Sequence, residues 1–194
     1  MMQKGVFMQP AKRRNFGSMG PKLGTFNYIG TNCVTIIIQD TRHRLWVGTD
    51  KDGLYLLASN KKLISPSTKV PVTILCMSED KFGRIWIGSY QQGCGWVDGE
   101  SDAYHAVDIN AKGSSSIFGM DTDNSGNIWF ATMGQGLIRL NLTDYSIKQY
   151  RMRAGADINR QTNSLPNDYL AKIKVSHDGK RIYVAGSVGM SCLD

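Results

Sequence analysis

The chain has 194 residues, which is long enough for a domain with a hydrophobic core of its own. Hydrophobic residues make up 41% and charged residues 20% of it, a balance that excludes wholesale disorder, and no apolar run approaches the ~18 residues of a membrane-spanning helix. Lysine and arginine total 23 against 16 acidic residues, and the resulting net charge of +7 suits an anionic partner.

The first 31 residues contain one short apolar segment and one basic cluster. Gly5-Val6-Phe7-Met8 is predicted to be a strand. Lys12-Arg13-Arg14 is the tightest basic cluster of the chain, and most short clusters of this kind are solvated loops. Because the remaining positive charge is scattered along the sequence, we expect the chain as a whole to bind no nucleic acid.

Two strands of similar composition follow, at residues 34–38 and 72–76. Val34-Thr35-Ile36-Ile37-Ile38 and Val72-Thr73-Ile74-Leu75-Cys76 are almost entirely apolar and rich in β-branched residues. Runs of this kind predict strands that are buried on both faces.

A longer motif recurs after these strands. Its first copy is Asp40-Thr41-Arg42-His43-Arg44-Leu45-Trp46-Val47-Gly48-Thr49, followed by Gly53-Leu54. Further copies begin at Asp80 and Asp123. A weaker fourth copy begins at His177, with Tyr183 in place of tryptophan and a turn that is one residue shorter. A period of roughly 40 residues is the signature of a repeat architecture.

The residue types of one repeat predict four short strands. The Asp-x-x-Gly segment is a turn, because aspartate can accept a hydrogen bond from the backbone two residues on and glycine tolerates positive φ. Residues 45–47 are then a second strand, and the stretch from Gly48 to Gly53 is a second turn. Residues 54–57 form a third strand and residues 62–64 a short fourth. No segment has a convincing helical period.

A four-stranded unit of about 40 residues with one large aromatic side chain is typical of a β-propeller blade. The predicted fold class is therefore all-β: a partial β-propeller of about four blades, each a four-stranded antiparallel sheet. We expect a single domain over 1–194. It would comprise the end of a preceding blade and a linker at 1–31, blades at 32–70, 71–113 and 114–164, and a partial blade at 165–194.

The chain opens in what corresponds to the third strand of a blade, at Gly5–Met8, and it stops at the same point of the last blade. Either the two ends complete a shared blade and close a small four-blade ring, or the chain is a piece of a larger propeller, which we favour. Large aromatic residues on the second strands are predicted to fill the gaps between blades, and the small residues Gly48, Gly88 and Ala131 to let adjacent sheets approach. The predicted core aromatics are Trp46, Trp86, Trp129 and Tyr183.

Repeats of this form resemble the two-component-regulator propeller repeat, which makes up the periplasmic sensor region of hybrid two-component systems in gut bacteria such as Bacteroides. The resemblance covers roughly residues 32–194, and His43 stands where the family has glycine. It implies a receptor with two propellers, an immunoglobulin-like domain, a membrane helix, a histidine kinase, a receiver and a DNA-binding output domain. Such receptors detect oligosaccharides and regulate glycan-utilisation genes. This segment would be periplasmic and would meet the membrane only through its parent protein.

Nothing in the sequence predicts catalysis. His43 and His177 fall in predicted turns and His105 in a predicted loop, and none lies at catalytic spacing from a partner. The segment Asp121–Asn127 has the oxygen ligands of a calcium loop, but Thr132 stands where a bidentate glutamate is expected. We therefore predict no enzyme activity, no metal and no cofactor. A protein-interaction scaffold and, less favoured, a lyase-like propeller enzyme are the alternatives.

A ligand is expected at one face of the propeller, where the loops between second and third strands meet the connections between blades. Amides and carboxylates suit sugar hydroxyls, and aromatic rings suit sugar C–H faces. The net positive charge favours an anionic oligosaccharide. Further expected partners are the remaining blades of the receptor and a second copy of the chain, through strand exchange. The candidate ligand-binding residues are Asp50, Lys51, Tyr90, Gln91, Gln92, Trp96, Met133 and Gln135, with Ser187 at the equivalent place in the last repeat.

Overall fold

The computed structural model describes residues 7–8, 17–18, 33–57, 63–64, 70–98, 100, 103–109, 116–153 and 164–194. Within these ranges every regular element is a strand, and no helix is long and apolar enough to cross a membrane. The basic cluster at 12–14 lies outside the described residues. The strands are β1 (Phe7–Met8), β2 (Gly17–Ser18), β3 (Val34–Gln39), β4 (Leu45–Thr49), β5 (Leu54–Leu57), β6 (Leu63–Ile64), β7 (Ile74–Glu79), β8 (Ile85–Ser89), β9 (Cys94–Val97), β10 (His105–Val107), β11 (Ile117–Thr122), β12 (Asn127–Thr132), β13 (Leu137–Asn141), β14 (Ile147–Tyr150), β15 (Leu170–Val175), β16 (Ile182–Gly186) and β17 (Gly189–Leu193).

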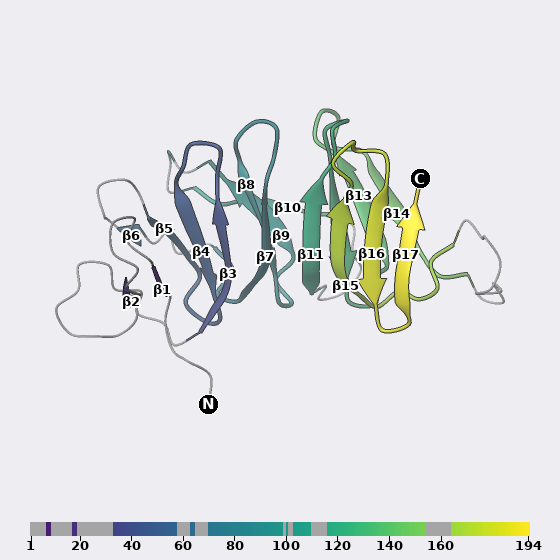
Figure 1. Cartoon of the computed structure of the whole chain (residues 1–194), viewed down its shortest axis with the longest axis horizontal. Coiled ribbons are helices and arrows are strands. Elements are labelled where there is room, and N and C mark those ends of the chain that lie inside the picture. The colour runs from purple at the N-terminus through teal and green to yellow at the C-terminus, as the bar shows by residue number, and fades with distance from the viewer. Residues whose placement is uncertain are drawn as a thin grey trace.

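Four antiparallel sheets follow one another as the blades of a partial propeller (Figure 1). Blade A is β3–β6, blade B is β7–β10, blade C is β11–β14 and blade D is β15–β17, and in each the strands pair in chain order. The first strands β3, β7, β11 and β15 lie side by side along the row. The expectation of an all-β, partial propeller is thereby confirmed.

Strands β1 and β2 form a separate two-stranded sheet at the opposite end of the row from β17 (Figure 1). They do not extend the sheet of blade D. The shared blade that would close a four-blade ring is therefore not formed among the described strands.

The turn between the first two strands has the geometry that its aspartate and glycine predict. Asp80 Oδ1 accepts hydrogen bonds from the backbone N–H groups of Phe82 (2.8 Å) and Arg84 (3.1 Å). Gly83 has a φ of 75°, and His43 adopts a φ of 61° at the same place in blade A. Each such turn reverses the chain within a few residues and so sets the register of its hairpin.

The turn of blade D differs from the expectation. Ser176, not Asp178, closes it: the Ser176 N–H donates to the Arg181 carbonyl (2.8 Å), and the Arg181 N–H donates to Ser176 Oγ (2.9 Å). In blade A the corresponding bond runs from the Asp40 N–H to the Arg44 carbonyl. The turn of blade D is therefore one residue longer than the others, and not one shorter.

The hydrophobic core consists of three buried clusters, each shared by two successive blades. The tryptophan of the second strand belongs each time to the cluster between its own blade and the next. Trp46, Trp86 and Trp129 are 1%, 0% and 5% exposed. The cluster between A and B includes Trp46, Leu54, Ile74, Ile85 and Ile87; that between B and C includes Cys76, Trp86, Ile117, Ile128 and Phe130; that between C and D includes Trp129, Leu137, Leu170, Ile182 and Val184.

Three residues that the sequence predicts to be buried are exposed or half-buried. Ile37 is 43% exposed, whereas Met77, at the equivalent place in blade B, packs against blade A. Because no described blade covers the first face of blade A, β3 is buried on one face only. Val72 lies outside β7 and is exposed. Tyr183 is half-buried and belongs to none of the clusters, since alternation along β16 directs its neighbours Ile182 and Val184 toward blade C.

Candidate functional site

The loops between second and third strands come together with the connections between blades, on what we call the loop face. In every blade the residue after the second strand donates a backbone hydrogen bond to the residue immediately before the first strand. These bonds run from Asp50 to Cys33 (3.1 Å), Tyr90 to Thr73 (3.1 Å), Met133 to Ser116 (3.0 Å) and Ser187 to Tyr169 (3.3 Å).

Two candidate residues of the loop face have side-chain oxygens bonded to the connection between blades A and B. Asp50 Oδ1 accepts a hydrogen bond from Thr73 Oγ1 (3.1 Å). Gln92 Oε1 accepts one from the backbone N–H of Val72 (3.1 Å). Both bonds join a loop of one blade to the connection between blades, so these side chains stabilise the loop face itself.

Lys51, Gln91 and Gln135 have mainly backbone roles. Lys51 and Gln91 adopt positive φ values of 74° and 58° at the loop tips. The Gln91 N–H donates to Ser116 Oγ (3.2 Å). The Gln135 carbonyl accepts a hydrogen bond from Gln149 Nε2 (2.8 Å). The side chains of Lys51 and Gln91 are exposed and can turn toward a ligand.

The accessible apolar side chains of the loop face lie on blades B to D. Tyr90 is 49% exposed, Met133 42% and Tyr169 57%. Met133 and Tyr169 are joined by an isolated β-bridge between blades C and D. Sequence analysis missed Tyr169, although its place just before β15 corresponds to that of Thr73 and Ser116 in the other repeats.

Trp96 does not belong to this group. It lies on β9 in register with Trp86 and with His105, and its ring stacks on the His105 ring at a centroid distance of 3.9 Å. The Arg84 guanidinium lies 4.8 Å from the Trp96 centroid. The prediction that His105 sits in a loop is wrong, because it is the first residue of β10. Trp96 and His105 thus pack on the outer strands of blade B.

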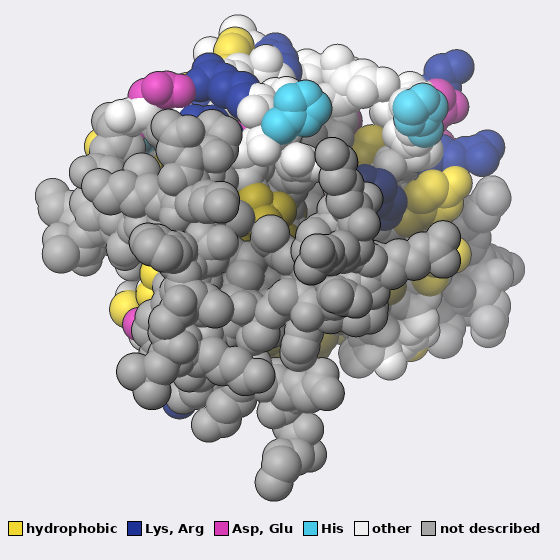
Figure 2. All heavy atoms as spheres, turned by 60° about the vertical axis from the view of Figure 1, so that its left-hand side comes forward, with side chains coloured by type: hydrophobic (Ala, Val, Ile, Leu, Met, Phe, Trp, Pro, Cys, Tyr) yellow, Lys and Arg dark blue, Asp and Glu magenta, His cyan; other side chains and the backbone are white. Residues whose placement is uncertain are grey.

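The opposite edge of the blades, which we call the turn rim, is formed by the turns between first and second strands. Figure 2, where this rim is uppermost, shows lysine, arginine and histidine side chains along it. Most of the rim arginines are used structurally: Arg84 Nε donates to Asp80 Oδ2 (2.7 Å), and Arg44 Nε to Asp40 Oδ2 (2.7 Å). The rim therefore offers fewer free cations than its composition suggests.

The carboxylates of the calcium-loop segment are occupied by protein donors. Asp123 Oδ2 accepts hydrogen bonds from Trp129 Nε1 and Asn127 Nδ2 (both 2.8 Å). Asp121 Oδ2 accepts from the Val175 N–H (2.9 Å) and pairs with Lys174 Nζ (2.8 Å). Among the described residues, no group of three or more His, Cys, Asp or Glu side chains is arranged to hold a metal ion.

The buried cysteines are placed as core residues. Cys76 and Cys94 lie in the cluster between blades B and C. Burial raises the pKa of the Cys94 thiol to about 12 and shifts the pKa of Cys76 in the same direction. A thiol with a raised pKa carries little thiolate at neutral pH, so neither residue is a candidate nucleophile.

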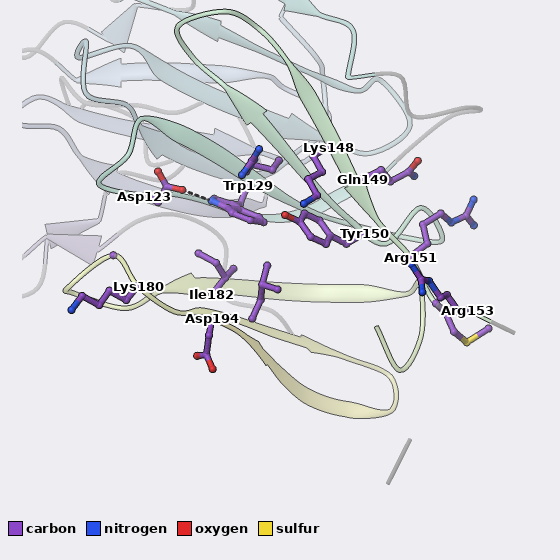
Figure 3. Close-up of a pocket in the computed structure, with 14 residues that line it drawn as sticks. Asp123, Trp129, Lys148, Gln149, Tyr150, Arg151, Arg153, Lys180, Ile182 and Asp194 are labelled. Carbon is purple, nitrogen blue, oxygen red and sulfur yellow. Dashed lines mark hydrogen bonds between the residues drawn. The ribbon is translucent and has the colours of Figure 1, made fainter. Parts of the chain in front are cut away.

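A second candidate site lies between blades C and D and was not foreseen from the sequence. It is a cavity of about 680 Å³, lined by cations from β13, β14 and the turn of blade D and by aromatic rings (Figure 3). The Trp129 and Tyr150 rings stack at 5.7 Å. A comparison of the repeats could have found it, since Arg139 and Lys148 stand in register with Trp129 where blade B has Trp96 and His105.

Comparison with known proteins supports this fold. The family described as two component regulator propeller matches residues 28–51 and 69–91. No curated protein matches the chain. Similar solved structures include the extracellular domains of the hybrid two component systems BT4673 (TM-score 0.75) and BT3049 (TM-score 0.72) of B. thetaiotaomicron, each 18% identical. They align with 98% and 97% of this chain and with 24% of their own.

A third similar structure is PorZ, a surface component of the type-IX secretion system of Porphyromonas gingivalis. It is 15% identical, with a TM-score of 0.62, and the alignment covers 95% of this chain and 28% of PorZ. The chain therefore spans about a quarter of the length of these three proteins. The family model thus matches two of the repeats of this chain, and the described residues fold as four successive blades of a β-propeller.

Proposed function

We propose that this chain is the ligand-sensing segment of a membrane-bound hybrid two-component sensor, lies in the periplasm, and binds oligosaccharides that regulate glycan-utilisation genes. The segment itself contributes binding and no chemistry; the kinase belongs to the rest of the receptor. The observation that carries the proposal is the row of accessible apolar side chains on the loop face of blades B to D: Tyr90, Met133 and Tyr169.

The composition of this surface suits a sugar. Tyrosine rings can pack against the C–H faces of a pyranose, while their hydroxyl groups and the exposed amide of Gln91 can bond to sugar hydroxyls. The backbone bonds between loops and connections hold these residues in place, so little ordering is needed on binding. The family match and the likeness to extracellular sensor domains support the receptor role.

The test is a binding survey with neutral and charged oligosaccharides, followed by calorimetry on the full chain with Tyr90→Ala and Tyr169→Ala. Loss of one aromatic contact is expected to weaken binding by up to roughly tenfold. Tyr145→Ala is the matched control, because Tyr145 is equally exposed but lies in the β13–β14 turn. Binding that neither loop-face substitution alters would contradict the proposal.

A further inference from the structure

The face of blade C that points toward blade D is built differently from the equivalent face of blade B. In blade B the residues in register across β8, β9 and β10 are Trp86, Trp96 and His105, and the Trp86 and Trp96 rings pack toward blade C. In blade C the same row is Trp129, Arg139 and Lys148. Two positions that carry aromatic rings in one repeat thus carry cations in the next, at the place where the cavity opens.

The cavity has a strong excess of positive charge. Five cationic side chains line it against two carboxylates, and both carboxylates already have partners: Asp123 accepts from Trp129, and Asp194 pairs with Arg181 at 3.3 Å. Of the five cations, Arg151 pairs with Asp168 (2.8 Å). Among the described residues, no carboxylate forms an ion pair with the other four, which are Arg139, Lys148, Arg153 and Lys180.

Arg139 is the most enclosed of these cations. Its guanidinium lies 5.9 Å from the Trp129 centroid, and its Nε is buried with no hydrogen-bond partner. An unpartnered buried donor on a charged group is costly, and an anion that reoriented the guanidinium could relieve that cost. The enclosure also limits screening by water, so attraction to an anion is stronger here than at the exposed rim.

The cavity also offers an aromatic surface beside the cations. Tyr150 is half-buried, stacks on Trp129, and has Lys148 Nζ at 4.9 Å from its ring centroid. Figure 3 shows Trp129, Lys148 and Tyr150 grouped on one wall, with Lys180 and Ile182 on the blade D side. At about 680 Å³ the cavity falls within the size range of small-ligand sites. Cations next to a ring match a ligand that combines an oxyanion with a flat apolar face.

We propose that this cavity between blades C and D binds an anionic saccharide, with Arg139 and Lys148 contacting its sulfate or carboxylate groups and Tyr150 its ring. The proposal deepens the sensing function proposed above and rests on it for the saccharide class. It adds a site that is separate from the loop face. It also places five of the cationic side chains of this basic chain around one cavity.

The experiment is calorimetric titration of the full chain with four probes: a sulfated disaccharide, a uronate-containing disaccharide, the neutral disaccharide of the same backbone, and inorganic sulfate. We expect both charged sugars to bind at least tenfold more tightly than the neutral one. Their affinity should fall as NaCl is raised from about 50 to 500 mM. Equal affinity for the charged and neutral sugars would overturn the proposal, and sulfate binding as tight as that of the sugars would overturn the saccharide class.

Substitutions then locate the site. Arg139→Gln and Lys148→Gln are each expected to weaken binding of the charged sugars at least tenfold. If Arg139→Gln unfolds the chain, Lys148→Gln still tests the proposal, because Lys148 is exposed and its substitution does not disturb the core. Lys174→Gln is the matched control, since it removes one charge from β15 outside the cavity. An equal loss in all three variants would indicate non-specific attraction and contradict the proposal.

The two proposals can fail separately. If Tyr90→Ala abolishes binding of the charged sugars while Lys148→Gln and Arg139→Gln do not, the loop face is the site and the cavity proposal is wrong. If the cavity variants lose binding and the loop-face variants keep it, the cavity stands and the loop-face assignment is wrong. No saccharide binding at either place would overturn both.

Discussion

At the scale of single residues, the aspartate of each repeat joins the turn to the core. In blades A, B and C its Oδ1 accepts backbone N–H groups of the turn. Its Oδ2 accepts the indole N–H of the tryptophan six positions later, at 2.9, 2.7 and 2.8 Å. Sequence analysis assigned Asp40, Asp80 and Asp123 to the turn alone. The bond to tryptophan depends on how β4, β8 and β12 leave the turn, which composition does not reveal.

Asp80→Asn should destabilise the chain by about 2–4 kcal/mol, because an amide replaces a buried carboxylate that accepts from Trp86 and Arg84. Urea denaturation followed by tryptophan fluorescence measures the change. Asp178→Asn is the control: Asp178 lies in the exposed turn of blade D and should cost below about 1 kcal/mol. Equal losses in the two variants would mean that the bond to tryptophan contributes nothing.

Low pH should weaken the hydrogen bond between the aspartate and the tryptophan in blades A and C. Burial alone would raise the pKa of Asp40, but hydrogen bonds from Trp46 and Arg44 outweigh it and hold that pKa below 3.8; hydrogen bonds from Trp129 and Asn127 do the same for the pKa of Asp123. A carboxyl whose pKa is lower in the folded state stabilises the fold at pH values above its unfolded-state pKa of about 3.9. This stabilisation is lost as the pH falls through the folded-state pKa.

Denaturation at a series of pH values checks this expectation. The free energy of unfolding should be level near neutrality and fall below about pH 4. Asp123→Asn should start from a lower free energy and fall less steeply over the same range, because one of the depressed carboxyls has been removed. A slope unchanged by the substitution would rule out Asp123 as a source of the acid sensitivity.

At the scale of elements, each blade depends on how closely the next one approaches its second strand. A Cβ atom at Gly88 would lie 2.5 Å from Cys76 Sγ, 2.8 Å from Ile117 Cγ2 and 2.9 Å from Met120 Cε. Two of these atoms belong to β11 of the following blade, so the absence of a side chain at Gly88 lets blade C pack on β8. The equivalent residue of blade C is Ala131, which is fully buried. The spacing between blades C and D therefore accommodates a methyl group.

Gly88→Ala should therefore cost about 1–3 kcal/mol through overpacking, whereas the reciprocal Ala131→Gly should cost about 1 kcal/mol, mostly through backbone entropy and a lost methyl contact. Thermal unfolding of the two variants compares these effects. Adding Cys76→Ala to Gly88→Ala removes the nearest clash and should restore part of the loss. A Gly88→Ala variant as stable as the parent would show that the two blades can separate slightly without penalty.

The sequence predicts the blades well, but two features of the candidate sites could not be predicted from it, for a physical reason. Turn residues such as Asp40 and Gly83 act within a few positions, and Trp46, Trp86 and Trp129 fill equivalent gaps in three repeats, so local spacing suffices to recognise them. The cavity beside Arg139 and the accessible Tyr169 depend on cross-strand register and on the meeting of two blades. Trp96 illustrates the limit: it is near Tyr90 in the sequence, yet it packs with His105 on the outer strands.

At the scale of the whole molecule, the described blades form an open row with uncovered surfaces at its end. Blade D has three strands; Met190 in its last strand is 73% exposed, and Val188, just before that strand, is 56% exposed. Exposed apolar residues next to an unpaired strand edge favour pairing with another strand. We therefore expect the isolated chain to self-associate through β17.

Sedimentation velocity over a range of concentrations tests this expectation. The parent chain should show a concentration-dependent shift to larger species, and Met190→Lys should suppress it by placing a charge at the strand edge. Tyr145→Lys, which adds a charge at an exposed site far along the chain from β17, should leave the shift unchanged. A monomer at every concentration would contradict association through this edge.

The three clusters between blades have a consequence for how such a protein can change over generations. Each is built from largely equivalent positions of neighbouring repeats, so the junctions between successive blades are similar to one another. Duplication or loss of one complete repeat would leave an interface between blades that is similar to the existing ones. Repeat proteins built this way can lengthen, shorten and diversify by whole units. If the cavity binds as proposed, new specificity would arise at the few positions, such as Arg139 and Lys148, whose side chains differ from the common packing.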